Sequence, residues 1–160
     1  MANYCFNRLT VRGDQKELNR FRTTIWKSED EPINFASTVP IPPELENTQC
    51  PNNDPLIIRQ VRKIKYGYDN WYDWQLANWG CKWGPYDHSM SDPEEKIYKN
   101  GKGKLVYTFD TPWSPPTEWI MNTSKLFPSL KFQNYCNEPG CCFKGTQFII
   151  NGMITKDTIK

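Results

Sequence analysis

The chain has 160 residues, enough for a single domain whose hydrophobic core needs no metal or disulfide to support it. Hydrophobic residues make up 38% and aromatic residues 14%, so the core is predicted to contain a few large rings. The formal net charge of +2 is too small to indicate nucleic-acid binding by overall electrostatics, and any basic site must be local. No apolar run has the length of a signal peptide or membrane span, so we expect a cytoplasmic protein with reduced thiols and no membrane partner.

A strand is predicted first, because residues 3–12 alternate in character. One side carries Tyr4, Phe6, Arg8 and Thr10, and the other carries Cys5, Asn7, Leu9 and Val11. Asp14 is a candidate N-cap for the next segment. An amphipathic helix to about Trp26 is predicted there, from the helical spacing of Leu18, Phe21 and Ile25.

Proline dominates the region that follows. Residues 32–55 hold six of the 13 prolines, a density that excludes a regular helix. We expect an ordered, irregular loop in which residues 33–35 form a short edge strand. A second helix is then predicted after Pro55, with apolar residues at helical spacing and basic residues mostly on its other side. The apolar set is Ile57, Val61, Ile64 and Tyr68, and the basic set is Arg59, Arg62, Lys63 and Lys65.

Four of the seven tryptophans lie in residues 68–84, YDNWYDWQLANWGCKWG. A helix is predicted to about Trp79, where Gly80 is a good C-terminal stop. The rings form a wide stripe on that helix, which is more typical of a core than of a platform for bases or sugars. A platform would need rings exposed on a sheet with Arg or Lys interleaved, and Lys82 is the only basic residue between Trp71 and Trp83. The rings are therefore predicted to pack the inserted helix against the sheet.

The C-terminal half is predicted to contain mainly strands. Residues 82–87 are a candidate short strand, residues 92–104 a loop or hairpin connection, and residues 105–111 a strand. Ser114, followed by two prolines, is a candidate hydroxyl cap for a helix that stops at Pro128. Two final strands, residues 130–136 and 142–151, are joined through residues 137–140. The element order predicts an α+β fold: one ferredoxin-like, split βαβ domain over residues 1–160, with helices on one face of an antiparallel sheet and an insertion at about residues 32–80.

No metal or cofactor is predicted. The six cysteines lack zinc-type spacing, and a site built from Cys136, one of its neighbours Cys141 and Cys142, and His88 is disfavoured against buried, reduced thiols on a hairpin. His88 is the only histidine and has no nucleophile motif beside it. An enzyme that uses His88 and the nearby carboxylates Asp92, Glu94 and Glu95 is the least favoured hypothesis.

Two basic groups are candidate phosphate contacts, although each also fits an ordinary soluble surface. One is the loop KIYKNGKGK with Lys96, Lys99, Lys102 and Lys104, and the other is Arg59, Arg62 and Lys63 on the second helix. Trp113 is a candidate anchor for a protein partner, because the adjacent prolines could hold its ring outward. The alternative is that Trp113 packs under the next helix as a hydrophobic staple.

Four segments, MANYCFNRLTVRG, NWYDWQLANWGCKWG, FDTPWSPPTEWI and YCNEPGCCFKG, together resemble the YubB ferredoxin-like domain family, which occurs on plasmids, in phages and in prophages. The resemblance spans nearly the whole chain. It implies a ferredoxin-like fold without an iron–sulfur cluster and supplies no catalytic residues. It also implies an accessory protein of a mobile element that acts inside a bacterial cell.

The leading functional hypothesis is a non-enzymatic phage or mobile-element protein that binds and inhibits a host component. That component would be a nuclease or another defence complex, as for an anti-CRISPR-like protein. The alternative is a binder of nucleic acid or of a signalling nucleotide through the lysine-rich loop.

Overall fold

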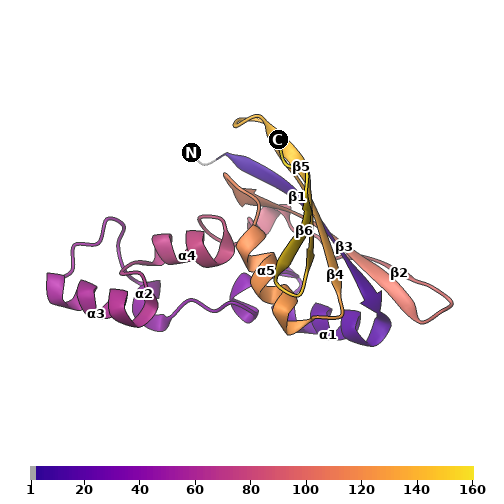
Figure 1. The fold of residues 1–160 in the computed structure, drawn as a ribbon, viewed down its shortest axis with the longest axis horizontal. Coiled ribbons are helices and arrows are strands. Elements are labelled where there is room, and N and C mark those ends of the chain that lie inside the picture. Colours follow the sequence, from indigo (N-terminus) through magenta and orange to yellow (C-terminus); the bar gives the residue numbers. More distant parts are fainter. Residues whose placement is uncertain (1–2) are drawn as a thin grey trace.

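A computed structural model describes residues 3–160 and shows an antiparallel sheet with helices on one side (Figure 1). The strands are β1 (Tyr4–Asp14), β2 (Glu94–Ile97), β3 (Lys102–Pro112), β4 (Lys131–Glu138), β5 (Phe143–Ile150) and β6 (Met153–Asp157). The α-helices are α1 (Gln15–Ile25), α2 (Pro43–Glu46), α3 (Leu56–Tyr66), α4 (Trp71–Trp79) and α5 (Thr117–Leu126). Two short 3₁₀ turns are η1 (Phe35–Ser37) and η2 (Asp87–Ser89).

The strand order is β2-β3-β1-β4-β5-β6, and every neighbouring pair is antiparallel. The first four strands, with α1 following β1 and α5 following β3, form two interlocked split βαβ units, which is the ferredoxin-like arrangement. Strands β5 and β6 extend the sheet beyond β4. The predicted α+β class and ferredoxin-like topology are therefore confirmed.

Aromatic rings fill the space between the sheet and its helices. Phe21 of α1 meets Tyr107, Phe127 and Phe132 edge-to-face, with centroid distances of 6.1, 5.3 and 5.5 Å. These four side chains are at most 2% exposed. Such pairs add about 1 kcal/mol each beyond the apolar area that they bury. The prediction of a core built from large rings is confirmed.

Trp119 holds the insertion against α5, and Trp79 ties two parts of the insertion together. The Trp119 ring stacks on Phe35 at 4.2 Å, and its indole N–H donates to the Phe35 carbonyl at 3.2 Å. Trp79 donates its indole N–H to the Val39 carbonyl at 2.9 Å. Trp74 and Trp79 are 8% and 6% exposed, which confirms a core role for these two rings, whereas Trp71 and Trp83 are only half-buried.

Four local predictions are wrong. The proline-rich segment contains one helical turn, α2, because Pro43 occupies the first turn of the helix, where proline is tolerated. Residues 33–35 form no strand, because the Asn34 side chain accepts the Ser37 N–H and caps η1. Residues 82–87 form no strand but bends, an irregular stretch and the first residue of η2, although Tyr86 N–H donates once to the Asp110 carbonyl. The Ser114 hydroxyl does not cap α5, because it donates to the Gly80 carbonyl at 2.6 Å and Pro116 takes the N-cap position.

The cysteines are all free thiols, and only half of them are buried. Cys5, Cys81 and Cys136 lie inside, but Cys141 and Cys142 are exposed, which contradicts the expectation of buried thiols on the hairpin. They occupy the β4–β5 turn, where the Glu138 carboxylate accepts the N–H groups of Gly140 and Cys141 and fixes the turn. Within residues 3–160, no group of three or more His, Cys, Asp or Glu side chains is placed to hold a metal ion. The described helices include none with the length and apolar character to cross a membrane.

Candidate functional site

One face of the sheet carries no helix, because α1 and α5 both pack on the other (Figure 1). Successive side chains of β1 alternate between the two faces of the sheet. Cys5, Asn7, Leu9 and Val11 are buried under the helices. Tyr4, Phe6, Arg8, Thr10 and Arg12 point to the uncovered side. We call this uncovered side the open face.

Four cations form a row across the open face. The strand register places Lys96 of β2 opposite Lys104 of β3, Lys104 opposite Arg12 of β1, and Arg12 opposite Lys131 of β4. Directly opposed residues share a face, and neighbouring strands lie about 4.8 Å apart, so the four side chains are immediate neighbours. We call Lys96, Lys104, Arg12 and Lys131 the cation row.

The cation row is electrostatically unfavourable by itself. Like charges directly opposite one another destabilise a sheet. Within residues 3–160, none of the four pairs with a carboxylate, and Arg12 instead donates to the Gln133 side-chain oxygen at 2.8 Å. An anion lying across the row would relieve this repulsion. The arrangement is therefore suited to bind phosphate or another extended anion.

Aromatic rings and further cations share the open face. Phe6 and Tyr135 meet edge-to-face at 6.5 Å, and Lys156 lies over the Phe148 ring at 5.9 Å from its centroid. Tyr4 and Phe6 remain 46% and 39% exposed. The register also puts Arg8 and Lys144 on this side, opposite Tyr135 and Asn137. Exposed rings interleaved with Arg and Lys thus occur on the sheet, although not in the tryptophan segment.

A shallow hollow lies beside the cation row. Its lining includes the buried Thr10 and Val106 together with Arg8, Arg12 and Lys104, and its volume is about 430 Å³. A second hollow of about 350 Å³ lies at the end of the sheet, where it shares Arg12 and is also lined by Lys102, Lys131 and the carboxylate of Asp14. Volumes of this size suit a small organic group such as one nucleobase or one nucleotide.

Acidic groups are few on this face. Glu94 lies opposite Val106, Asp110 lies opposite Phe6, and Asp14 lies opposite Lys102. Burial raises the pKa of Asp110 above its usual range, although the nearby charge of His88 works in the other direction. His88 itself is exposed beside the rings of Tyr4 and Tyr86, with centroids 6.0 and 5.6 Å away.

The predicted basic residues separate into two groups in the structure. Lys96 and Lys104 belong to the cation row, Lys102 lies next to them on β3, and Lys99 lies in the turn between β2 and β3. Arg59, Arg62 and Lys63 lie on α3, at the other end of the molecule's long axis (Figure 1). Each of these three pairs with a carboxylate, Arg59 and Lys63 with Asp69 and Arg62 with Asp54. The two basic groups are not brought together.

Trp113 lies at the end of β3 in a strained turn. Its φ is 67°, unusual for a residue with a side chain, and the Ser114 N–H donates to the Pro112 carbonyl across it. The ring is 44% exposed, which fits an outward anchor better than a buried staple. Its role in binding stays a prediction.

Sequence reasoning missed the remaining members of the open face: Arg8, Arg12, Lys131, Lys144, Lys156, Tyr4, Phe6, Tyr135 and Phe148. Part of the signal was visible, because the alternation in residues 3–12 already put Tyr4, Phe6 and Arg8 on one side. The row itself depends on the register between strands far apart in the chain. A single sequence does not show that register.

The comparisons with known proteins concern the fold. Residues 93–160 match a family model described as a ferredoxin-like domain in Api92-like protein. Among solved structures, the crystal structure of protein api92 from Yersinia pseudotuberculosis is similar over 100% of this chain and 98% of that chain, with a TM-score of 0.53 and 10% sequence identity. A search of the curated proteins finds no match. The YubB family name is not confirmed by these matches, whereas the ferredoxin-like domain is. The chain is thus similar to Api92-like proteins, through a ferredoxin-like domain at residues 93–160.

Proposed function

We propose that the chain acts by binding and that its open face binds single-stranded nucleic acid. The observation that carries the proposal is the cation row, in which Lys96, Lys104, Arg12 and Lys131 stand side by side without carboxylate partners among the described residues. A phosphate backbone supplies regularly spaced anions that match such a row. The net charge of +2 does not oppose this, because the positive charge is concentrated on one face.

The exposed rings favour single strands over duplex. Reading a duplex in its major groove requires a helix or a two-stranded ribbon that enters it, and the open face presents neither. Unpaired bases, by contrast, stack on exposed rings, and each stacked base contributes about 1–3 kcal/mol. Phe6 and Tyr135 lie together toward one end of β1, and Arg12 lies toward the other. Phe6 and Arg12 are six residue steps apart, about 20 Å, so on the order of four nucleotides could connect the rings with the cation row.

The test is a titration with short labelled oligonucleotides, followed by fluorescence anisotropy at low salt. A single-stranded 12-mer should bind more tightly than the matching duplex. The double substitution Arg12→Glu with Lys104→Glu should weaken single-strand binding by about 100-fold or more, since each contact to an ionised group contributes about 1.5–3 kcal/mol.

The matched control is Lys16→Glu with Lys125→Glu, which changes the net charge equally on the two helices that cover the other face. This control should bind almost as the unchanged protein does. Equal losses of affinity in both double variants would show that only the net charge of the protein matters, which would contradict the proposal. Binding of a free mononucleotide as tightly as the oligonucleotide would instead indicate a nucleotide ligand in the hollow beside Thr10.

A second candidate is the binding and inhibition of a host protein, such as a nuclease or defence complex of a bacterium that carries the mobile element. The exposed, strained Trp113 favours it, because exposed tryptophans are frequent energetic anchors of interfaces. A pull-down with and without nuclease tests this candidate. A partner that survives nuclease and is lost on Trp113→Ala, with unchanged thermal unfolding, would support it over the first.

A further inference from the structure

Helix α3 turns its apolar side outward. Its exposed fractions are 66% for Leu56, 67% for Ile57, 43% for Ile58, 56% for Val61 and 87% for Ile64, and no residue of the helix is buried. An amphipathic helix normally buries this stripe in its own core. Here the stripe is a contiguous apolar surface, of the kind that marks an interaction site.

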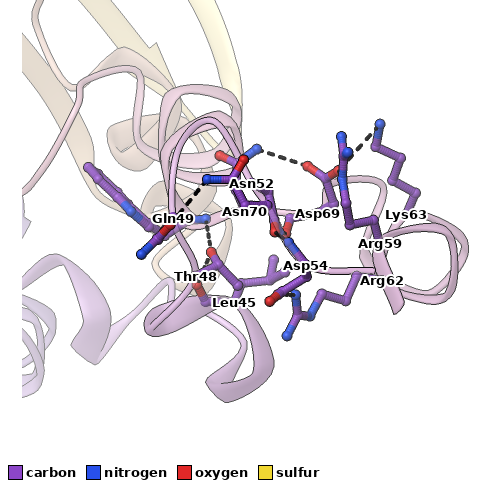
Figure 2. A network of polar contacts seen from close by, with 12 residues as sticks. Leu45, Thr48, Gln49, Asn52, Asp54, Arg59, Arg62, Lys63, Asp69 and Asn70 are labelled. Carbon is purple, nitrogen blue, oxygen red and sulfur yellow. Dashed lines mark hydrogen bonds and ion pairs between the residues drawn. The ribbon is translucent and has the colours of Figure 1, made fainter. Parts of the chain in front are cut away.

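The polar side of α3 is fixed to the rest of the chain instead. Figure 2 shows Asp69 beside Arg59 and Lys63, with N–O distances of 2.9 and 3.5 Å, and Asp54 beside Arg62. Lys65 adds an ion pair to Glu44 at 2.9 Å.

These contacts hold the helix in a fixed orientation. The Asp69 side chain is only 5% exposed and also accepts the Asn70 side-chain N–H at 2.9 Å. Burial by itself would raise the pKa of Asp69, but the hydrogen bonds from Arg59 and Asn70 and the charge of Lys63 lower it overall. The Asp69 carboxylate is thus kept ionised at the centre of the network. The network holds α3 in place, and α3 exposes the apolar stripe.

The charges around the stripe argue against a strongly charged occupant. The four cations of α3 are matched by the carboxylates of Asp69, Asp54 and Glu44. Glu44 also borders a groove of about 430 Å³ that Ile57, Ile58 and Val61 line. A nearly balanced rim neither attracts an anionic membrane strongly nor repels an identical surface.

The size of the stripe fits a symmetric pair. Its five exposed side chains offer about 500 Å² per copy, so two copies would bury about 1,000 Å², where specific interfaces begin. Ile57, Val61 and Ile64 follow the four-and-three spacing with which paired helices interlock. In an antiparallel pair about a two-fold axis between Gln60 and Val61, Ile57 of each copy meets Ile64 of the other.

We propose that α3 is a homodimer interface and that the occupant of its apolar stripe is the stripe of a second copy. The pairing leaves both open faces free, because α3 and the sheet lie at opposite ends of the molecule (Figure 1). This inference does not depend on what the open face binds.

Sedimentation velocity from about 1 to about 100 µM tests the pairing, since an interface of this size should associate within that range. The unchanged protein should become a dimer, and Ile64→Asp should stay a monomer with unchanged circular dichroism. The matched control is Leu126→Asp, which puts the same charge on another exposed leucine, at the end of α5, and should still dimerise. Oligonucleotide binding per chain should be the same in all three.

A cross-link supplies the second measurement. With the exposed Cys50, Cys141 and Cys142 replaced by serine, Val61→Cys should form an intermolecular disulfide on mild oxidation, whereas Lys99→Cys should not. A monomer at every concentration, or an Ile64→Asp protein that still dimerises, would overturn the proposal. So would binding to anionic vesicles that Ile64→Asp abolishes, because the occupant would then be a lipid surface.

Discussion

The open face and helix α3 use the same residue types in opposite ways. On the open face, cations stand beside one another without carboxylate partners in residues 3–160, and on α3 every cation has one. The apolar groups differ as well, because the open face exposes rings among its cations and α3 exposes a stripe of aliphatic side chains. Cations without carboxylate partners, placed among aromatic rings, suit a single-stranded nucleic acid, because it carries both phosphates and unpaired bases. Cations that are already paired with carboxylates, around an aliphatic stripe, suit a protein surface. The arrangement of neighbours, and not the number of basic residues, distinguishes the two surfaces.

The largest expected effect concerns the link between these two regions. Trp79 packs in the core beside Phe35, whose ring stacks on Trp119 of α5, and the Trp79 bond to Val39 ties α4 to the start of the insertion. Trp79→Ala should lower the free energy of unfolding by about 3–5 kcal/mol, as large aromatic truncations in cores do. Denaturant unfolding measures this change. A change below about 1 kcal/mol would show that the insertion carrying α3 is held to the sheet by other contacts.

A smaller effect is expected on ligand binding at the aromatic end of the open face. Phe6→Ala with Tyr135→Ala should weaken binding of a single-stranded oligonucleotide by about 1–3 kcal/mol, the loss of one stacked base, while the salt dependence stays nearly unchanged. Anisotropy titrations at two salt concentrations check both parts. The control is Ile57→Ala with Ile64→Ala on α3, which should leave oligonucleotide affinity unchanged. An equal loss of affinity in this control would contradict the distinction between the two surfaces.

Asp69 tests whether the polar network of α3 is structural. Asp69→Asn leaves Arg59 and Lys63 without their carboxylate and should cost about 1–2 kcal/mol, reduced from a buried-pair value because both cations are partly exposed. Oligonucleotide affinity should not change. If Asp69→Asn altered affinity without altering stability, α3 would belong to the ligand site and its paired cations would be functional.

Acidification should loosen α3 before the sheet. The pKa of Asp69 is lowered below its ordinary 3.8, because the Arg59 and Asn70 hydrogen bonds outweigh its burial, and that of Glu44 is lowered below 4.5 by hydrogen bonds from Tyr66 and Lys65. A lowered carboxylate pKa contributes stability that is present above the unfolded-state value and is lost as the pH falls through the folded-state value. Amide exchange of α3 should therefore rise below about pH 4, ahead of β1 and β4. Simultaneous loss of protection in both regions would contradict the separate network.

The sequence predicts most of the fold because local patterns set it. The alternation of residues 3–12 and the spacing of Leu18, Phe21 and Ile25 identify β1 and α1, and both are confirmed. Strand β6 was missed although its signal is present: Asn151 and Gly152 adopt φ values of 46° and 79°, as in the Asn-Gly hairpin turn.

The open face was only half predictable, for a physical reason. Lys96 and Lys104 stand out in a lysine-rich loop, but Arg12 and Lys131 lie far from them in the chain and join them only through strand register. The sequence also does not show that Ile64 is exposed. A 3.6-residue period identifies an amphipathic helix, but it does not tell what the apolar side of that helix packs against.

The salt dependence of single-strand binding tests the central claim most directly. If the four cations of the row contact phosphates, the logarithm of the binding constant should fall with the logarithm of salt concentration by a slope of about −3, at about −0.7 per phosphate for single strands. Replacing Arg12 and Lys104 with glutamine should reduce the slope to about −1.5, while Arg59→Gln with Lys63→Gln on α3 should leave it at about −3. An unchanged slope in the Arg12 and Lys104 variant, or no measurable binding by the unchanged protein at low salt, would contradict the assignment of the open face.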